Sequence, residues 1–413
     1  MHPVRAVVHA SPLTPLTVAG LSVVARTVLT LASAGVRTIT VVREDLAPEA
    51  LATAQTEVAS RLGDTTISWI GPDDADPHAQ AGTRVVTARI NGIFRGSLVS
   101  RLLARGRMGN VFMAFACVDA GLLMLSAPDH AALTRGEDVP YDLLQARTDD
   151  YHPVLSDKDV DAAERALFSW CIKETDGLVS RTLNRPISTR ISRHLSHLDI
   201  APRQLTAVTA ALALATFACL IIGTPLGLIA GCVLYHVTSV VDGLDGEVAR
   251  AKFMSSKSGA ALDTGVDMAS NLLFMIGVSV GCARVFGSTY LWMGAFTAAT
   301  AIAAIATMVM ALRFGPGGGS FDVLQLTIQR RLAAWPRFRH GFLYLNALFK
   351  RDFFAFGFAA LGVTGREGWI PGILAFGTAA WLLTILLNVP AILRANREDV
   401  LPPHLRTQSV ADT

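Results

Sequence analysis

Four aspartates stand in two otherwise apolar segments of this chain, Asp242 and Asp245 in the first and Asp263 and Asp267 in the second. The first pair is spaced i, i+3 and the second i, i+4, so each pair shares one face if its segment is helical. Charged side chains inside membrane-spanning helices are costly and are usually functional. These four carboxylates are therefore the first candidates for chemistry.

The two segments predict an antiparallel hairpin that turns near residues 254–255. This hairpin places Asp242 opposite Asp267 and Asp245 opposite Asp263, and the helical rise puts Asp245 about 8 Å further into the membrane than Arg250. Four carboxylates in a medium of low dielectric constant cannot all stay ionised without cations. Hard cations such as Mg²⁺ or Mn²⁺ take oxygen ligands, and two of them about 4 Å apart can clamp a diphosphate during cleavage.

The elements that must position these aspartates are membrane helices. The 413 residues are 51% hydrophobic and 17% charged, against about 25% charged in soluble proteins, which excludes a disordered chain and a purely soluble enzyme. A helix spans the hydrocarbon with about 20 apolar residues. Six segments meet this length and form an all-α six-helix bundle: Leu205–Ile222, Leu226–Ala249, Gly259–Ala283, Tyr290–Leu312, Phe342–Val363 and Trp369–Leu393.

Charge predicts the orientation of this bundle. The loops after the second and fourth helices and the segment before the first are rich in Lys and Arg, and such loops stay in the cytoplasm. Both termini are therefore expected in the cytoplasm, with the bundle in the cell (inner) membrane. The net charge of +3 is too small to indicate nucleic acid binding. The five cysteines are scattered without close spacing, which argues against a disulfide framework or a zinc site.

The two acidic segments also carry a longer pattern. The run Asp-Gly-Leu-Asp-Gly-Glu-Val-Ala-Arg over 242–250, then eight residues, then Gly259, Asp263 and Asp267, fits the signature DxxDGxxARx8GxxxDxxxD. Through this signature the chain resembles the CDP-alcohol phosphotransferase (CDP-alcohol phosphatidyltransferase) family over about residues 176–394. The resemblance implies a transferase of substituted phosphate groups: an acceptor hydroxyl attacks the β-phosphorus of a CDP-alcohol, and CMP leaves.

The resemblance also implies residue roles. Asp242, Asp245, Asp263 and Asp267 resemble the ligands of Mg²⁺ or Mn²⁺, with two ions expected, and Asp267 resembles the general base. The segment 200–206 is similar to the family's TPNxxT stretch, although Arg203 replaces the usual Asn. The residues expected to bind the CDP-alcohol are Pro202, Gln204, Thr206, Gly246, Ala249, Arg250, Ser256 and Gly259.

The identity of the acceptor follows from a narrower resemblance. Residues 175–193 are similar to the segment before the membrane domain of di-myo-inositol-phosphate-phosphate synthases. This similarity implies an inositol phosphate or another polyol phosphate as the acceptor, and the extra phosphate needs a cationic pocket for which Lys350, Arg351 and Arg394 are the candidates. The donor is left open between CDP-diacylglycerol and a soluble CDP-polyol, which would pass its group to a lipid or a sugar phosphate. Family members are commonly homodimers in contact with membrane lipid.

Residues 1–160 predict an α/β domain. Strands are expected at 5–9, 37–42, 66–70, 84–90, 111–117 and 122–125, and helices at 21–34, 48–62 and 98–105. The order resembles a nucleotidyltransferase of the sugar-nucleotide type. However, the loop 10–16 holds no Gly and no basic residue to bind a triphosphate, and the strand before Asn91 ends without a carboxylate for a metal. We therefore expect a degenerate, non-catalytic domain.

The expected organisation is thus a domain at 1–160, a linker with an amphipathic helix at the membrane surface at 161–203, the transferase bundle at 204–395 and a cytoplasmic tail at 396–413. Two other functions would also use acidic side chains in a membrane. One is a cation transporter with an acidic site, and the other is a Mg²⁺-dependent prenyltransferase. A transporter leaves the Gly246, Ala249 and Arg250 positions and the eight-residue spacing unexplained. The six-helix count and the single compact motif argue against a prenyltransferase.

Overall fold

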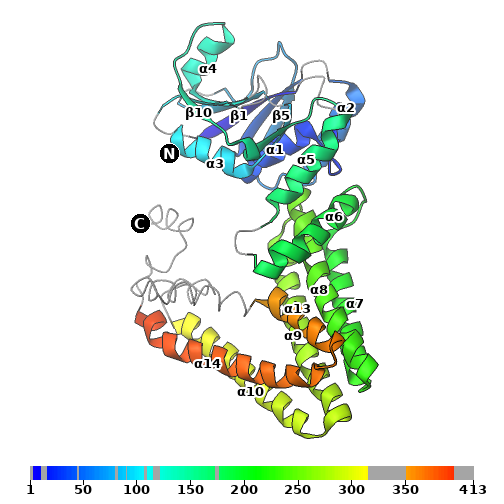
Figure 1. Ribbon diagram of the computed structural model, residues 1–413. Coiled ribbons are helices and arrows are strands. Elements are labelled where there is room, and N and C mark those ends of the chain that lie inside the picture. Colours follow the sequence, from blue (N-terminus) through cyan, green and yellow to red (C-terminus); the bar gives the residue numbers. More distant parts are fainter. Residues whose placement is uncertain are drawn as a thin grey trace. The chain divides into compact units, whose positions relative to one another are not determined.

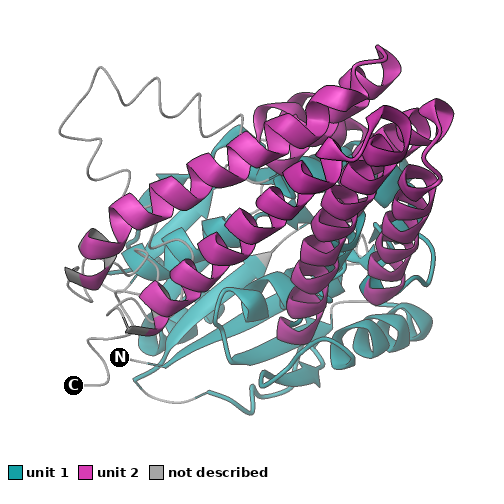
Figure 2. Ribbon diagram, turned by 90° about the horizontal axis from the view of Figure 1, so that it is seen from below, with its two compact units in different colours: residues 1–174, 189–202, 244–256 teal, residues 175–188, 203–243, 257–413 magenta. Residues whose placement is uncertain are grey.

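A computed structural model describes residues 3–10, 16–43, 46–79, 82–89, 91–106, 109–114, 121–172, 176–314 and 350–394. The chain forms two compact units that do not follow its linear order (Figure 2). The first comprises residues 1–174, 189–202 and 244–256, and the second comprises 175–188, 203–243 and 257–413.

The first unit is built on a seven-stranded sheet in the order β10-β8-β9-β6-β1-β4-β5 (Figure 1). Strand β1 pairs in parallel with β4 and β6, whereas β9 runs antiparallel between β6 and β8. Two short pairs, β2 with β3 and β7 with β11, lie outside this sheet. The strands are β1 (Val4–Ala10), β2 (Thr17–Val18), β3 (Leu21–Ser22), β4 (Thr38–Arg43), β5 (Thr66–Ile70), β6 (Arg84–Arg89), β7 (Gly92–Phe94), β8 (Val111–Ala114), β9 (Gly121–Ser126), β10 (Asp142–Gln145) and β11 (Tyr151–Pro153).

Five helices accompany the sheet: α1 (Val23–Ser33), α2 (Pro48–Ala59), α3 (Gly96–Arg105), α4 (Ala127–Thr134) and α5 (Asp157–Trp170). Buried side chains of α1 and α3 share the main core with alternate residues of β1, including Ala6 and Val8. Intervening residues such as Val7 belong to a smaller cluster on which Ala127 of α4 packs. The alternation of strand side chains thus gives each face of the sheet its own core.

The predicted α/β class is confirmed for this unit. Where the helices and strands differ from the predicted ones, the causes are local. Helix α1 begins at Val23 rather than at residue 21 because Ser22 is its N-cap, whose hydroxyl accepts a hydrogen bond from the Ala25 N–H. Strand β8 is described only to Ala114, since residues 115–120 lie outside the described part. The elements not predicted from the sequence are β2, β3, β7, β10, β11, α4 and α5. Of these, β10 and α4 have no buried residues and so lack a hydrophobic periodicity.

The second unit is helical, and the described residues contain five helices that are long and apolar enough to cross a bilayer. The sixth predicted span, Phe342–Val363, is described only from residue 350, and its described helix has 13 residues. The count of six is therefore not confirmed. The helices are α7 (Pro202–Ile221), α8 (Pro225–Ala251), α9 (Lys257–Phe286), α10 (Thr289–Phe314), α13 (Arg351–Val363) and α14 (Ile370–Arg394).

Small residues allow these helices to approach closely. A Cβ atom at Gly281 of α9 would lie 2.3 Å from the Leu220 carbonyl oxygen of α7, and one at Gly362 of α13 would lie 2.8 Å from the Cβ of Cys232 on α8. Close approach through small residues is typical of membrane helix interfaces. Beside them, Tyr235 of α8 stacks on Phe274 of α9 with ring centroids 3.8 Å apart.

The segment before the bundle is helical from residue 178 to residue 196, and it contains a π-turn over Ser180–Asn184 before α6 (Arg185–Ser196). The N–H of Arg185 donates to the Ser180 carbonyl, five residues earlier. Pro186 explains this widening, because proline has no N–H to donate and its ring clashes with the carbonyl four residues back. The amphipathic pattern is present, with Ile187 and Ile191 exposed.

Candidate functional site

The two halves of the acidic signature lie on consecutive helices. Helix α8 carries Asp242 and Asp245, and α9 carries Asp263 and Asp267, with residues 252–256 between the helices. The i, i+3 and i, i+4 spacings therefore do place each pair on one helix face. Asp245 is buried and accepts a hydrogen bond from the Gly246 N–H at 2.5 Å, whereas Asp263 is half-buried.

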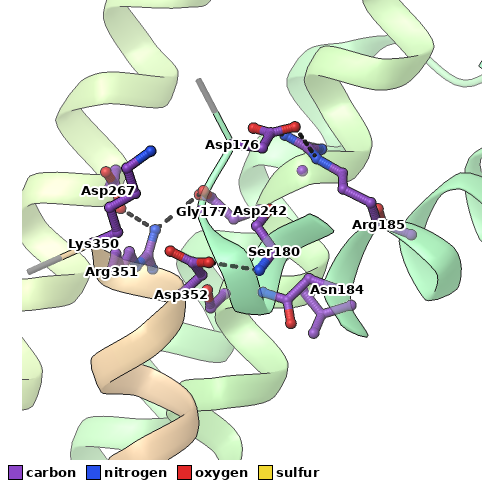
Figure 3. Close-up of a pocket in the computed structure, with 14 residues that line it drawn as sticks. Asp176, Gly177, Ser180, Asn184, Arg185, Asp242, Asp267, Lys350, Arg351 and Asp352 are labelled. Atoms are coloured by element: carbon purple, nitrogen blue, oxygen red, sulfur yellow. Dashed lines mark hydrogen bonds and ion pairs between the residues drawn. The ribbon is translucent and has the colours of Figure 1, made fainter. Parts of the chain in front are cut away.

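A polar pocket of about 260 Å³ lies in the second unit, and Figure 3 shows the side chains around it. Three stretches of chain supply its walls: the segment with the π-turn, the middle of α8 and α9, and the start of α13. The lining residues are Asp176, Gly177, Ser180, Asn184, Arg185, Ser188, Ser239, Val240, Asp242, Gly243, Asp267, Lys350, Arg351 and Asp352.

The centre of this pocket is the guanidinium of Arg351. Its Nη1 atom lies 3.1 Å from Asp242 Oδ2 and also donates to Asp267 Oδ1, and its Nη2 atom donates to Ser270 Oγ at 3.2 Å. The guanidinium carbon lies 5.9 Å from the ring centre of Tyr235, within the range of a cation–π contact. Asp242 and Asp267, which the sequence places opposite each other, thus meet at one cation.

The wall beside the π-turn is held by two further carboxylates. Asp352 is buried and accepts a hydrogen bond from the Ser180 N–H at 2.5 Å, so it caps the helix that starts there (Figure 3). Gly177 makes room for it, because a Cβ atom at this position would lie 2.3 Å from Asp352 Oδ2. Asp176 binds Arg185 through both carboxylate oxygens, at 2.9 and 3.1 Å.

Of the three cations predicted to bind the acceptor phosphate, Lys350 and Arg351 line this pocket. Arg394 is the last residue of α14, and its side chain lies outside the described part. The pocket therefore combines two of the predicted catalytic carboxylates with two of the predicted phosphate-binding cations.

The other half of the signature is fixed within the first unit. Arg250 Nη2 donates to the Cys171 carbonyl at 3.3 Å, and Ser192 Oγ donates to Glu247 Oε2 at 2.7 Å. Glu247 is fully buried. Gly246 lets the Arg250 side chain lie along the helix, since a Cβ atom there would come within 3.0 Å of Arg250 Nη1. Ala249 is half-buried on the same helix.

Two arginines of the sheet domain bind the carbonyl groups at the end of α8. Arg26 Nη1 donates to the Ala251 carbonyl at 2.8 Å, and Arg61 Nε donates to the Lys252 carbonyl at 3.0 Å. Arg26 is buried, and Nε also donates to the Val18 carbonyl at 2.6 Å. Burial lowers the pKa of Arg26 to about 10, which leaves it protonated at neutral pH. These cations satisfy carbonyls that a helix C-terminus leaves without partners.

The remaining residues expected at the CDP-alcohol lie around the starts of α7 and α9. Arg203, the departure from the family pattern, donates from Nη2 to Ser258 Oγ at 3.0 Å. Thr206 is buried, whereas Gln204 and Ser256 are exposed and Pro202 and Gly259 are half-buried.

Among the described residues, no three His, Cys, Asp or Glu side chains gather closely enough to hold a metal ion. The pair Asp242 and Asp267 nevertheless fits a divalent cation in its chemistry. Both supply carboxylate oxygens, the ligands that hard cations prefer, and both are directed at one positive group.

The sequence analysis missed several residues of the pocket. Asp176, Ser180, Asn184, Ser188 and Asp352 were not predicted as site residues. The first four lie within residues 175–193, whose resemblance indicated only the class of acceptor. Asp352 is an acidic residue at the start of an otherwise apolar segment, which was the one available signal.

Comparison with known proteins identifies the helical region. Residues 199–332 match the CDP-alcohol phosphatidyltransferase family, so this part of the chain is a domain of that family. The match includes all of the acidic signature and confirms the resemblance predicted from it.

Three similar curated proteins share the name "Bifunctional IPC transferase and DIPP synthase". The one from Archaeoglobus fulgidus is 34% identical over 186 residues, which is 41% of this chain and 36% of that protein. Those from Thermococcus kodakarensis and Aquifex aeolicus are each 40% identical, over 111 and 119 residues, which is 27% and 29% of this chain and 24% and 27% of theirs. The matches thus span little more than a third of these relatives at most.

The contacts of Arg351 predict the effect of its removal. In Arg351→Ala, the carboxylates of Asp242 and Asp267 lose their shared cation, and we expect unfolding in detergent with EDTA to become easier by about 1–3 kcal/mol. Added Mg²⁺ should then stabilise the variant more than the unchanged protein, because the freed carboxylates can bind it. Thermal unfolding with and without Mg²⁺ measures both effects. The exposed Arg366→Ala serves as the control, and equal behaviour of the two variants would contradict the assignment.

Proposed function

We propose that this chain, whose residues 199–332 form a CDP-alcohol phosphatidyltransferase domain, transfers a substituted phosphate group from a CDP-alcohol to a hydroxyl of an inositol phosphate or similar polyol phosphate, with release of CMP. The observation that carries the proposal is the pocket in which Asp242 and Asp267 meet Lys350 and Arg351. Carboxylates suit a proton acceptor, and adjacent cations suit a phosphate ester, so one small pocket holds what this acceptor requires.

Asp267 is the proposed general base. Its carboxylate reaches into the pocket and is partly exposed, so an acceptor hydroxyl can approach it. A base acts only within hydrogen-bond reach of the proton it removes. The guanidinium of Arg351 fixes the direction of this carboxylate together with that of Asp242.

Lys350 and Arg351 are the proposed ligands of the acceptor's phosphate. A guanidinium offers paired N–H donors that match phosphate oxygens, and an ammonium adds a point charge. Holding the phosphate here orients the polyol, so that one of its hydroxyls lies near Asp267. Binding and orientation of this kind lower the barrier by replacing a random encounter with a fixed geometry.

We propose that Asp242, Asp245, Asp263 and Asp267 hold Mg²⁺ or Mn²⁺, with two ions in the working enzyme. When bound, the ions would offset the negative charge of the diphosphate and of the departing CMP. Gly246, Ala249 and Arg250 are the proposed contacts of the cytidine and its phosphates, where Gly and Ala allow close approach to the backbone and Arg250 supplies charge.

We further propose six spans with both termini in the cytoplasm of the cell membrane, and a homodimer. The first 160 residues are proposed to be nucleotidyltransferase-like but non-catalytic. Their role is then to hold the end of α8, because Arg26 and Arg61 bind the carbonyls of Ala251 and Lys252. Outside these 160 residues but in the same compact unit, Cys171 and Ser192 bind Arg250 and Glu247.

The base assignment predicts the behaviour of Asp267→Asn. An amide cannot take the hydroxyl proton, so CMP release should fall about 10²- to 10⁴-fold. The test uses purified protein, CDP-diacylglycerol labelled in its cytidine, inositol 1-phosphate and Mg²⁺. Asp199→Asn, a matched change at an exposed aspartate, should keep full activity. Near-normal turnover by Asp267→Asn would contradict the assignment of Asp267 as the base. If the protein moves divalent cations without any CMP release, the proposed transferase function is wrong.

Because the sheet domain binds the end of α8, a substitution in that domain should weaken binding of the CDP-alcohol. Arg26→Ala frees the Ala251 carbonyl and loosens the helix end that carries Arg250. We expect KM for the CDP-alcohol to rise about tenfold, with little change in KM for the acceptor. The exposed Arg37→Ala is the control. Equal kinetics for the two variants, or a loss confined to kcat, would show that the sheet domain does not position the nucleotide site.

A further inference from the structure

One wall of the pocket carries none of the side chains to which the proposed reaction assigns a role. The π-turn segment supplies it with Ser180, Asn184 and Ser188. Asn184 is only 4% exposed, and its Oδ1 atom has no hydrogen-bond partner among the described residues. A buried amide oxygen without a partner is costly to a fold, so a residue of this kind at a pocket points to a ligand.

The π-turn accounts for the position of Asn184. One extra residue in the turn rotates the following side chains by about 100° relative to a regular helix. Asn184 is the last residue of this turn. Pro186, whose ring disfavours regular helix geometry in the preceding turn, follows two residues later. Figure 3 shows Asn184 on the same short segment as Ser180, whose N–H is bound by Asp352. The segment is therefore braced, and Asn184 is held at the pocket by a backbone that cannot easily shift.

A second buried atom at the pocket is a hydrogen-bond donor, whereas Asn184 Oδ1 is an acceptor. Arg351 Nε is a donor, and it has no partner among the residues that the structure describes. A ligand that satisfies both atoms must donate a hydrogen bond to Asn184 and accept one from Arg351. A polyol phosphate meets both needs with separate groups, because a ring hydroxyl can donate to Asn184 while the anionic phosphate accepts from Arg351.

We propose that Asn184 determines acceptor specificity by hydrogen-bonding a ring hydroxyl of a polyol phosphate whose phosphate lies on Lys350 and Arg351. The inference rests on the proposed function, which makes this pocket the acceptor site. The size of the pocket agrees, since about 260 Å³ is at the small end of ligand sites. Its polar walls suit a compact hydroxylated ring better than an acyl chain.

The test is calorimetric binding to the purified full-length protein, with inositol 1-phosphate and inorganic phosphate as the two probes. The unchanged protein should bind inositol 1-phosphate at least about tenfold more tightly, because this probe adds a ring hydroxyl that donates to Asn184 while its phosphate lies on the cations. In Asn184→Ala this preference should fall to about one, with the affinity for inorganic phosphate unchanged. Asn184→Leu, which keeps the buried volume, should behave in the same way.

Thr182→Ala is the control, since Thr182 is exposed on the same segment and its hydroxyl binds only the Leu178 carbonyl in the described structure. It should keep the full preference. A preference that survives in both Asn184 variants, or an equal loss of both probes, overturns the proposal.

The labelled CMP assay separates this proposal from the proposed function. If the unchanged protein shows the Asn184-dependent preference but releases no CMP, the transferase fails and the assignment of Asn184 stands. If CMP is released and Asn184→Ala discriminates as well as the unchanged protein, only the assignment of Asn184 fails.

Discussion

The ion pairs between Arg351 and the carboxylates of Asp242 and Asp267 are the constraint on which the pocket depends. Two carboxylates on neighbouring helices repel each other in a medium of low dielectric constant, and a cation between them reverses the sign of that interaction. The guanidinium comes from α13, so one side chain ties three helices together. The rest of the pocket follows from this contact, because Lys350 and Asp352 are the chain neighbours of Arg351 and enter the pocket with it.

A second set of contacts gives the sheet domain a structural role at the acidic signature. Within the first unit, the buried Arg26 and the backbone of Cys171 bind the end of α8, and Ser192 binds the buried Glu247 inside the acidic signature itself. A helix end with satisfied carbonyls and a paired buried carboxylate has little freedom to fray. The domain can thus be retained for position rather than for chemistry.

Much of this arrangement could be predicted from spacing. The i, i+3 and i, i+4 pairs, the turn between the helices and the cations Lys350 and Arg351 were all visible, because helical periodicity and intramembrane charge are strong signals. The wall formed by Ser180 and Asn184 was not, because the π-turn breaks the 3.6-residue period on which such predictions depend. Likewise, no local pattern shows that Gly177 is small in order to admit Asp352, a residue far along the chain.

The most direct measurement is an experimental structure of the protein with inositol 1-phosphate, CMP and Mg²⁺. The account predicts the phosphate of inositol 1-phosphate within hydrogen-bond distance of Lys350 and Arg351, with one hydroxyl of the ring at the Asp267 carboxylate. A phosphate bound elsewhere, or a ring with no hydroxyl near Asp267, would contradict it.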